Sequence, residues 1–132
     1  MTIEPYAKPY YIRLHQKMWD WIADGITKGQ LDISNEEDAW EAKGYFLHEE
    51  EGLTRTFMNE CPACAYACED VPGSRDFCMY CPLVWPSTHT RFMCLHADTT
   101  ESEDGLYALF CAESDRTKQA ALARQIRDLP VR

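Results

Sequence analysis

The fold that we expect is decided by residues 61–81, which read CPACAYACEDVPGSRDFCMYC. This stretch holds two Cys-x-x-Cys pairs separated by thirteen residues. One Cys-x-x-Cys turn brings two thiolates close enough to chelate a metal ion, and two such turns complete a tetrahedral zinc site. A turn signal at residues 71–74, Val-Pro-Gly-Ser, lets the chain return to the same ion. We therefore predict a structural Zn²⁺ with four thiolate ligands: Cys61, Cys64, Cys78 and Cys81.

Two residues further along the chain could replace one of these four ligands. Cys94 and His96 form a Cys-x-His step, so either is a candidate substitute for one of the four, Cys94 above all. Pro82 follows the second pair and has no N–H to donate to a sulfur, which makes that half an imperfect zinc knuckle. The remaining two thiols are expected to be small buried side chains: Cys68 and Cys111.

Other cysteine chemistry stays open at this point. A dithiol oxidoreductase would use the first pair, but its motif normally opens a helix within a βαβ pattern that the sequence does not show. An iron–sulfur cluster could bind the same four cysteines. His89 with Asp76 does not reproduce the histidine pair of a treble-clef nuclease, and no phosphate loop or hydrolase motif occurs. A closed four-thiolate site has no open position for substrate, so we expect no enzyme activity.

Charge is distributed unevenly over this 132-residue chain, whose 22 acidic and 13 basic residues give a formal charge of −9. Residues 1–60 carry 12 acidic and 6 basic groups, residues 61–114 carry 8 and 2, and residues 115–132 carry 2 and 5. An acidic body repels phosphate, which disfavours nucleic acid and suits a partner protein with a basic surface. The alternative interpretation is a merely solvated surface. We place the partner-binding surface at six residues: Glu36, Glu37, Asp38, Glu49, Glu50 and Glu51.

The sequence predicts the cellular compartment from two signals that it does not show, a membrane span and a secretion signal. No apolar run approaches the ~18 residues that a membrane span needs, and no basic and apolar secretion signal opens the sequence. We therefore expect a cytoplasmic protein without a membrane partner, in a reducing compartment where clustered cysteines serve as ligands or catalytic thiols.

Helical patterns flank the cysteine stretch. Apolar spacing predicts helices over 9–24, from the capping box at Ser34 to about Lys43 with Gly44 as the stop, over the apolar run from Leu106, and from Ser114 or Asp115 to Asp128. A capping box at Thr100 precedes the third of these, and residues 45–47 and 53–58 could form short strands. We predict a mainly α fold, with a small α+β fold as the variant. It is a single helical domain over 1–132, built around a four-cysteine structural zinc knuckle or ribbon: N-terminal helices in 1–60, a zinc module in 61–96 and C-terminal helices in 97–132.

Further motifs accompany the two cysteine pairs: Trp19-Asp20-Trp21-Ile22-Ala23, Tyr66-Ala67, Pro82-Leu83-x-Trp85, Cys94-Leu95, Tyr107, Phe110 and Ala123-Arg124-Gln125-Ile126-x-x-Leu129-Pro130. Together they resemble a group of small cysteine-rich, zinc-binding proteins of unassigned function from phages and prophages of Gram-positive bacteria. The resemblance covers most of the chain, and Cys-Pro-Leu-x-Trp is its most specific element. Cys94 belongs to that pattern, whereas Cys68 and Cys111 do not.

The resemblance implies a function and a setting. A small acidic phage protein of this kind is expected to be an accessory factor in the cytoplasm of an infected bacterium, binding a host protein. Inhibition of an anti-phage defence, such as a CRISPR nuclease, is one such role. The competing class is a zinc-module protein that binds nucleic acid or regulates transcription through the basic segment 115–132.

Overall fold

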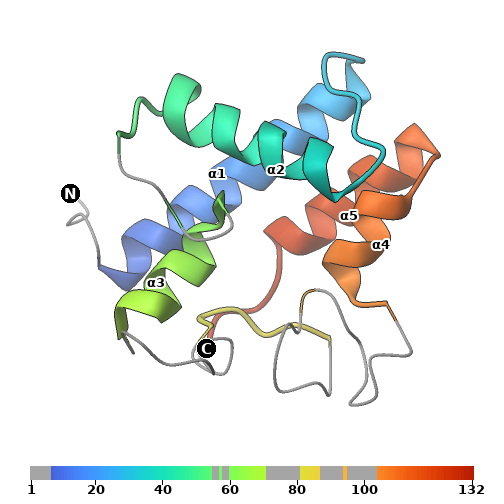
Figure 1. Cartoon of the computed structure of the whole chain (residues 1–132). Coiled ribbons are helices and arrows are strands. Elements are labelled where there is room, and N and C mark those ends of the chain that lie inside the picture. The colour runs from blue at the N-terminus through green and yellow to red at the C-terminus, as the bar shows by residue number, and fades with distance from the viewer. Residues whose placement is uncertain (1–6, 55–56, 58–59, 71–80, 87–93, 95–103) are drawn as a thin grey trace.

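A computed structural model describes residues 7–54, 57, 60–70, 81–86, 94 and 104–132 of the chain (Figure 1). The described elements are helical: α1 (Lys8–Thr27), α2 (Glu36–Tyr45), the π-helix η1 (Phe46–Glu50), α3 (Pro62–Asp70), α4 (Leu106–Ala112) and α5 (Arg116–Arg127). An isolated antiparallel bridge joins Leu83 to Val131, and Asp104 also lies in a bridge. The prediction of a mainly α protein is therefore confirmed.

Helix α1 lies at the centre of the fold. Proline in its first turn suits the start of a helix, and the apolar side chains that recur along one face are buried. This face packs against α5 and α3, and α1 also contacts α2 and η1; Figure 1 shows α2 and α3 crossing in front of it. The buried side chains include Tyr11, Leu14, Met18, Trp19, Ile22 and Ile26. The predicted helix over 9–24 is confirmed and is longer at both ends.

The second helix differs from its prediction at both ends. Asn35, rather than Ser34, is the N-cap, and its side-chain oxygen accepts a hydrogen bond from the backbone N–H of Asp38. Gly44 does not stop the helix, which continues through Tyr45 into η1. The strand suggested for residues 45–47 is wrong, because Phe46 and Leu47 bury their side chains from a helical backbone. A run of three apolar residues cannot by itself separate a strand from a buried helical turn.

The C-terminal half combines confirmed and unforeseen elements. Asp115 caps α5 by accepting a hydrogen bond from the backbone N–H of Lys118, as the sequence predicts. Helix α4 is also confirmed and has Gly105 as its N-cap, while the capping box at Thr100 lies outside the described residues. Helix α3 was not predicted, although it begins directly after Cys61. The turn signal at 71–74 and most of the segment 53–58 also lie outside the described residues, but Leu53, Thr54 and Phe57 are not in strands.

Two tryptophans of α1, Trp19 and Trp21, lie in different environments. Trp19 is buried and meets the ring of Phe110 in α4 edge to face, with 5.0 Å between ring centroids. Trp21 is half-buried and stacks on Tyr45 of α2 at 5.9 Å. These contacts tie α1 to both α4 and α2. In the part of the chain that the structure describes, no helix is long and apolar enough to span a membrane.

A histidine is buried in the packing between α1 and α5. His15 is 1% exposed, and its Nε2 lies 2.9 Å from the carbonyl oxygen of Ile126. Because a carbonyl can only accept, Nε2 carries the proton and donates it. The other ring nitrogen, Nδ1, is buried without a hydrogen-bond partner among the described residues. Burial lowers the pKa of His15 to about 4, so the ring is neutral at physiological pH.

This histidine predicts a loss of stability in mild acid. The pKa of His15 falls from 6.5 to about 4 on folding, so the unfolded chain binds more protons over that interval. The free energy of unfolding should therefore decrease as the pH falls from about 6.5 to about 4, with a contribution from His15 of about 3 kcal/mol. His15→Gln keeps a donor but does not titrate, and it should flatten this limb of the profile measured by urea unfolding at a series of pH values.

A second histidine supplies the control. His48 has a raised pKa, because both of its ring nitrogens face acceptors, and it therefore favours the folded state at low pH. His48→Gln should not flatten the acidic limb. If His15→Gln and wild type lose stability equally between pH 6.5 and 4, the role assigned to the buried ring is wrong.

Candidate metal centre

Four cysteines reach one neighbourhood from three segments of the chain. Cys61 directly precedes α3, and Cys64 lies in the first turn of that helix. Cys81 is buried at the start of segment 81–86. The carbonyl oxygen of Cys94 accepts hydrogen bonds from the backbone N–H groups at the start of α4, at 2.8 Å from Tyr107 and 3.3 Å from Ala108. The N-terminus of α4 thus holds Cys94 in place.

The pKa of the Cys64 thiol is affected by the other three cysteines. Its pKa is raised well above the ordinary value, first by its hydrogen bond with the Cys61 thiol, then by burial, and then by the negative charges that Cys61, Cys94 and Cys81 can carry. Cys61, Cys81 and Cys94 are thus close enough to Cys64 for their charges to act on its thiol. None of the five cysteines that the structure describes in atomic detail forms a disulfide.

Cys61 has the opposite tendency. A hydrogen bond from Cys64 is the largest cause that lowers its pKa, to about 6, and the charge of Lys43 and the backbone N–H groups of Cys64 and Ala63 act in the same direction. These N–H groups belong to the first turn of α3, where a helix has unpaired donors. The sequence did not reveal that the first cysteine pair opens a helix. This position favours a thiolate at Cys61, and thiolate is the form that binds a metal ion.

Cys64 lies within electrostatic reach of two other predicted ligands, Cys61 and Cys81, and of Cys94, the candidate substitute. Cys78 and His96 lie outside the described residues. Among the residues that are described, no three His, Cys, Asp or Glu side chains are already arranged to hold a metal ion. The donor set itself suits zinc, because neighbouring soft thiolates select it.

Cys68 and Cys111 are the two cysteines that the sequence places in the core. Cys111 is 3% exposed in α4, and burial raises the pKa of its thiol to about 11, so it is a protonated core residue as predicted. Cys68 lies in α3, but its side chain is outside the described part of the structure.

Lys43 is buried over the Tyr107 ring, which the sequence did not predict. Lys43 of α2 is only 5% exposed, and its Nζ lies 4.5 Å from the centroid of the Tyr107 ring. Its charge lowers the pKa of both Cys61 and Cys111. Helical spacing could have indicated this burial, because Lys43 follows the buried Ala39 by four residues and therefore lies on the same face of α2.

A second contact joins the same helical segment to the first cysteine pair. Glu60, which directly precedes Cys61, is buried and has a backbone φ of +49°, a strained value for a residue with a side chain. Its carboxylate lies 3.1 Å from Nε2 of His48 in η1, and Nδ1 of His48 lies 2.8 Å from the carbonyl oxygen of Leu53. These two contacts of His48 hold Glu60 in place directly before Cys61.

The Cys-Pro-Leu-x-Trp element, the most specific motif of the sequence, is placed between the thiols and the C-terminal helix. Leu83 is 1% exposed and forms the bridge with Val131, and the N–H of Val84 donates to the carbonyl of Pro130 at 2.7 Å. Trp85 lines a groove of about 750 Å³ together with Leu106 and the C-terminal part of α5. The element thus pairs with the residues that follow α5.

The six predicted partner-binding residues lie on α2, on η1 and directly after it, but they are not equivalent. The carboxylate of Asp38 accepts hydrogen bonds from the N–H and the hydroxyl of Ser34, at 3.0 and 2.9 Å, so it completes the cap of α2. Glu51 forms an ion pair with Lys17 of α1 at 2.5 Å. The other four are exposed: Glu36, Glu37, Glu49 and Glu50.

No protein-family model, curated protein or solved structure matches this chain. The resemblance drawn from the sequence motifs therefore remains a prediction, and the function has to be argued from the residues themselves.

The thiol cluster predicts a defined metal content. The purified protein should contain one zinc ion per chain by elemental analysis, and Cys64→Ser should lose both the metal and the cooperative thermal transition, because structural zinc supplies about 10 kcal/mol or more of folding free energy. Cys111→Ala should keep the metal. A fully folded, metal-free wild-type protein contradicts the prediction, and a brown preparation indicates an iron–sulfur cluster instead.

A matched pair of variants distinguishes Cys94 from Cys78 as the fourth ligand. Because the charge of Cys94 acts on the Cys64 thiol, we expect Cys94→Ser to weaken zinc binding as strongly as Cys64→Ser does. Cys78→Ser should then have the smaller effect. The reverse order, measured by competition with a chromophoric chelator, would assign the site to the two Cys-x-x-Cys pairs alone.

Proposed function

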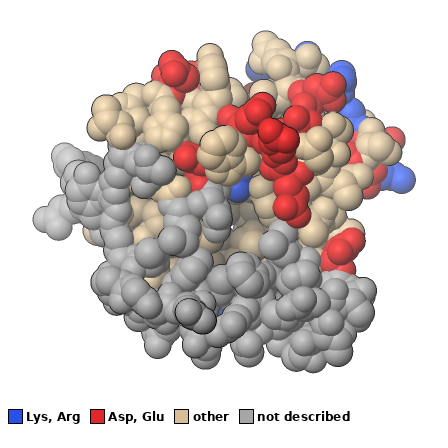
Figure 2. Space-filling model, in the orientation of Figure 1, with Lys and Arg blue, Asp and Glu red and all other residues tan. Residues whose placement is uncertain are grey.

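We propose that this chain is a zinc-stabilised, non-enzymatic binding protein whose acidic surface occupies a basic site on another protein. The observation that carries the proposal is the exposed face of α2 and η1. Glu36, Glu37 and Glu41 project from α2, and Glu49 and Glu50 from η1, all of them exposed. Figure 2 shows carboxylates gathered where α2 crosses the same view in Figure 1, with Lys and Arg mainly at the rim.

Exposed aromatic side chains are interleaved with these carboxylates. Trp40 is 53% exposed and Tyr45 is 54% exposed, although both are large and apolar. Tryptophan and tyrosine are the residues that most often dominate the energetics of protein interfaces, and arginine is their frequent counterpart. A face of aromatics surrounded by carboxylates therefore suits an arginine-rich protein surface.

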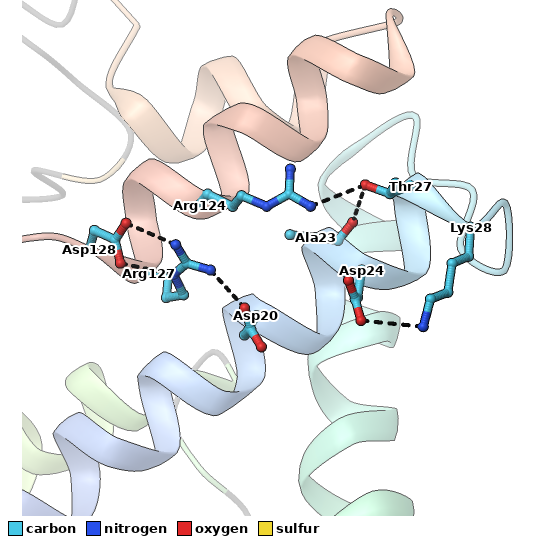
Figure 3. Close-up of polar contacts among 8 residues, drawn as sticks. All are labelled: Asp20, Ala23, Asp24, Thr27, Lys28, Arg124, Arg127 and Asp128. Atoms are coloured by element: carbon cyan, nitrogen blue, oxygen red, sulfur yellow. Dashed lines mark hydrogen bonds and ion pairs between the residues drawn. The ribbon is translucent and has the colours of Figure 1, made fainter.

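The basic C-terminal helix is less available to a partner, as Figure 3 shows. The guanidinium of Arg127 lies 2.7 Å from the carboxylate of Asp20 in α1 and 2.8 Å from that of Asp128. Arg124 donates a hydrogen bond to the hydroxyl of Thr27 at 3.3 Å. These two arginines fasten α5 to α1, which supports a protein partner over the competing class that binds nucleic acid through this helix.

The metal has a structural role in this proposal. Four thiolates around Zn²⁺ leave no coordination position for water or substrate, so the centre would join α3, α4 and segment 81–86 without taking part in a reaction. The resemblance to phage proteins supplies the biological setting: an accessory protein in an infected bacterium that inhibits a host defence factor, of which a CRISPR nuclease is an example.

The acidic face predicts a charge-dependent interaction. The variant Glu37→Lys/Glu50→Lys should bind the captured host protein at least about tenfold more weakly at low salt, because it places positive charges against a basic surface. Its melting temperature should stay close to that of wild type, since both side chains are exposed. The partner is first captured from a lysate of the bacterial host and identified by mass spectrometry, and affinities are then measured with the purified pair.

The control for this experiment carries the same charge change elsewhere. Asp32 and Asp104 are exposed and lie off α2 and η1, so Asp32→Lys/Asp104→Lys should retain the affinity. Equal weakening by both double variants would show that only net charge matters. Unchanged affinity of Glu37→Lys/Glu50→Lys would refute the proposed surface.

The competing class makes its own prediction. If α5 bound DNA or RNA, the protein would be retained on duplex or single strands at low salt, and retention would fall steeply as salt is added. Because Arg127 and Arg124 are engaged within the chain, we expect no such retention in a filter-binding or band-shift measurement.

A further inference from the structure

Two aromatic rings from different helices stack beside the exposed glutamates of α2 and η1. The rings of Trp21 in α1 and Tyr45 in α2 are nearly parallel, with 17° between their planes and 5.9 Å between their centroids. Trp21 is half-buried and also contacts the buried ring of Phe46, at 5.6 Å, which anchors it to the core. Tyr45 is nevertheless 54% exposed. The surface therefore carries an aromatic ring that is open to solvent and held in orientation by a second ring.

Two carboxylates lie next to this exposed ring. Glu41 precedes Tyr45 by four residues and Glu49 follows it by four, and both side chains are exposed. Residues four apart are neighbours on the surface of a helix. The exposed cation Lys17 of α1 is already engaged in an ion pair with Glu51. The Tyr45 ring is thus an apolar surface flanked by negative charge.

The guanidinium group of arginine fits this arrangement. It is planar and weakly hydrated, so it stacks on an aromatic face, and its fork of N–H donors matches the geometry of a carboxylate. The ammonium of lysine is a compact, strongly hydrated charge that does not stack. Phosphate groups and acidic side chains are repelled by Glu41 and Glu49. Charge complementarity and the open ring together favour arginine.

We infer that the stacked pair of Trp21 and Tyr45 binds one arginine side chain of the partner protein. The inference rests on the proposed function and deepens it by naming the group of the partner that is recognised. The guanidinium lies flat on the face of the Tyr45 ring that is opposite Trp21 and donates hydrogen bonds to a flanking carboxylate. Because Trp21 orients the ring before binding, little side-chain freedom is lost when the complex forms.

Trp40, the other strongly exposed aromatic residue of α2, provides a matched comparison. It is 53% exposed, and Glu36 and Glu37 precede it by four and three residues. In the described part of the chain no second ring packs against it. Trp40 thus shares the exposure and the acidic neighbours of Tyr45 but not the supporting ring. We expect it to add apolar contact without selecting arginine over lysine.

The test measures how the purified protein distinguishes arginine from lysine. Hexa-arginine and hexalysine peptides of equal charge are titrated by calorimetry at low salt, and thermal melting checks that each variant is folded. We expect wild type to bind hexa-arginine about fivefold more tightly than hexalysine. Tyr45→Leu keeps an apolar side chain against Trp21 but removes the ring, and it should lose this preference. Tyr45→Phe, which keeps the ring, should retain it, and so should Trp40→Leu.

Equal affinity of wild type for the two peptides, or an unchanged preference in Tyr45→Leu, overturns the inference. If Tyr45→Leu does not fold, Glu41→Gln/Glu49→Gln replaces it, because both side chains are exposed, and an unchanged preference in that variant is equally contradictory. Binding of neither peptide also overturns the inference. The proposed function is judged separately, by whether Glu37→Lys/Glu50→Lys weakens binding of the captured host protein.

Discussion

The burial of one face of α1 is the interaction on which the other elements depend. Its apolar stripe is covered by α5 on one side and by α3 on another, and its two tryptophans reach α4 and α2. His15 and Asp20 add polar fastening, one to a backbone carbonyl of α5 and one to Arg127. Segments that are distant in sequence are thereby brought together, so that the charges of Cys81 and Cys94 act on Cys64, which a chain of short helices could not achieve by local propensity alone.

The thiol cluster lies where these segments converge. Cys61 and Cys64 come with α3, Cys94 is held by the N-terminus of α4, and Cys81 leads into the segment that bridges to the C-terminus. Helix α2 buries Lys43 and exposes glutamates and aromatics. In the function that we propose, a metal-stabilised interior would hold a rigid acidic surface toward the partner, and α2 would belong to both.

Helices with strong periodicity or clear caps were predictable. The stripe of α1 and the cap of α5 at Asp115 follow from side-chain spacing and side-chain oxygens, which act within one or two turns. The extension of α2 past Gly44 was not predictable, because the burial of Phe46 and Leu47 against the rest of the core outweighs the local cost of a glycine. Helix α3 was not predictable, because nine residues are too few for an apolar period to distinguish a helix from the turns of a metal site.

Local sequence was sufficient for a mainly helical chain, two chelating cysteine pairs and the separation of an acidic body from a basic end. These are properties of neighbouring residues, so spacing and composition show them. Tertiary packing was needed to establish that the charge of Cys94 reaches Cys64, that Lys43 is buried, and that the arginines of α5 are engaged with α1. These pairings join residues far apart in the chain, and the distances between them are set by how the helices pack around α1.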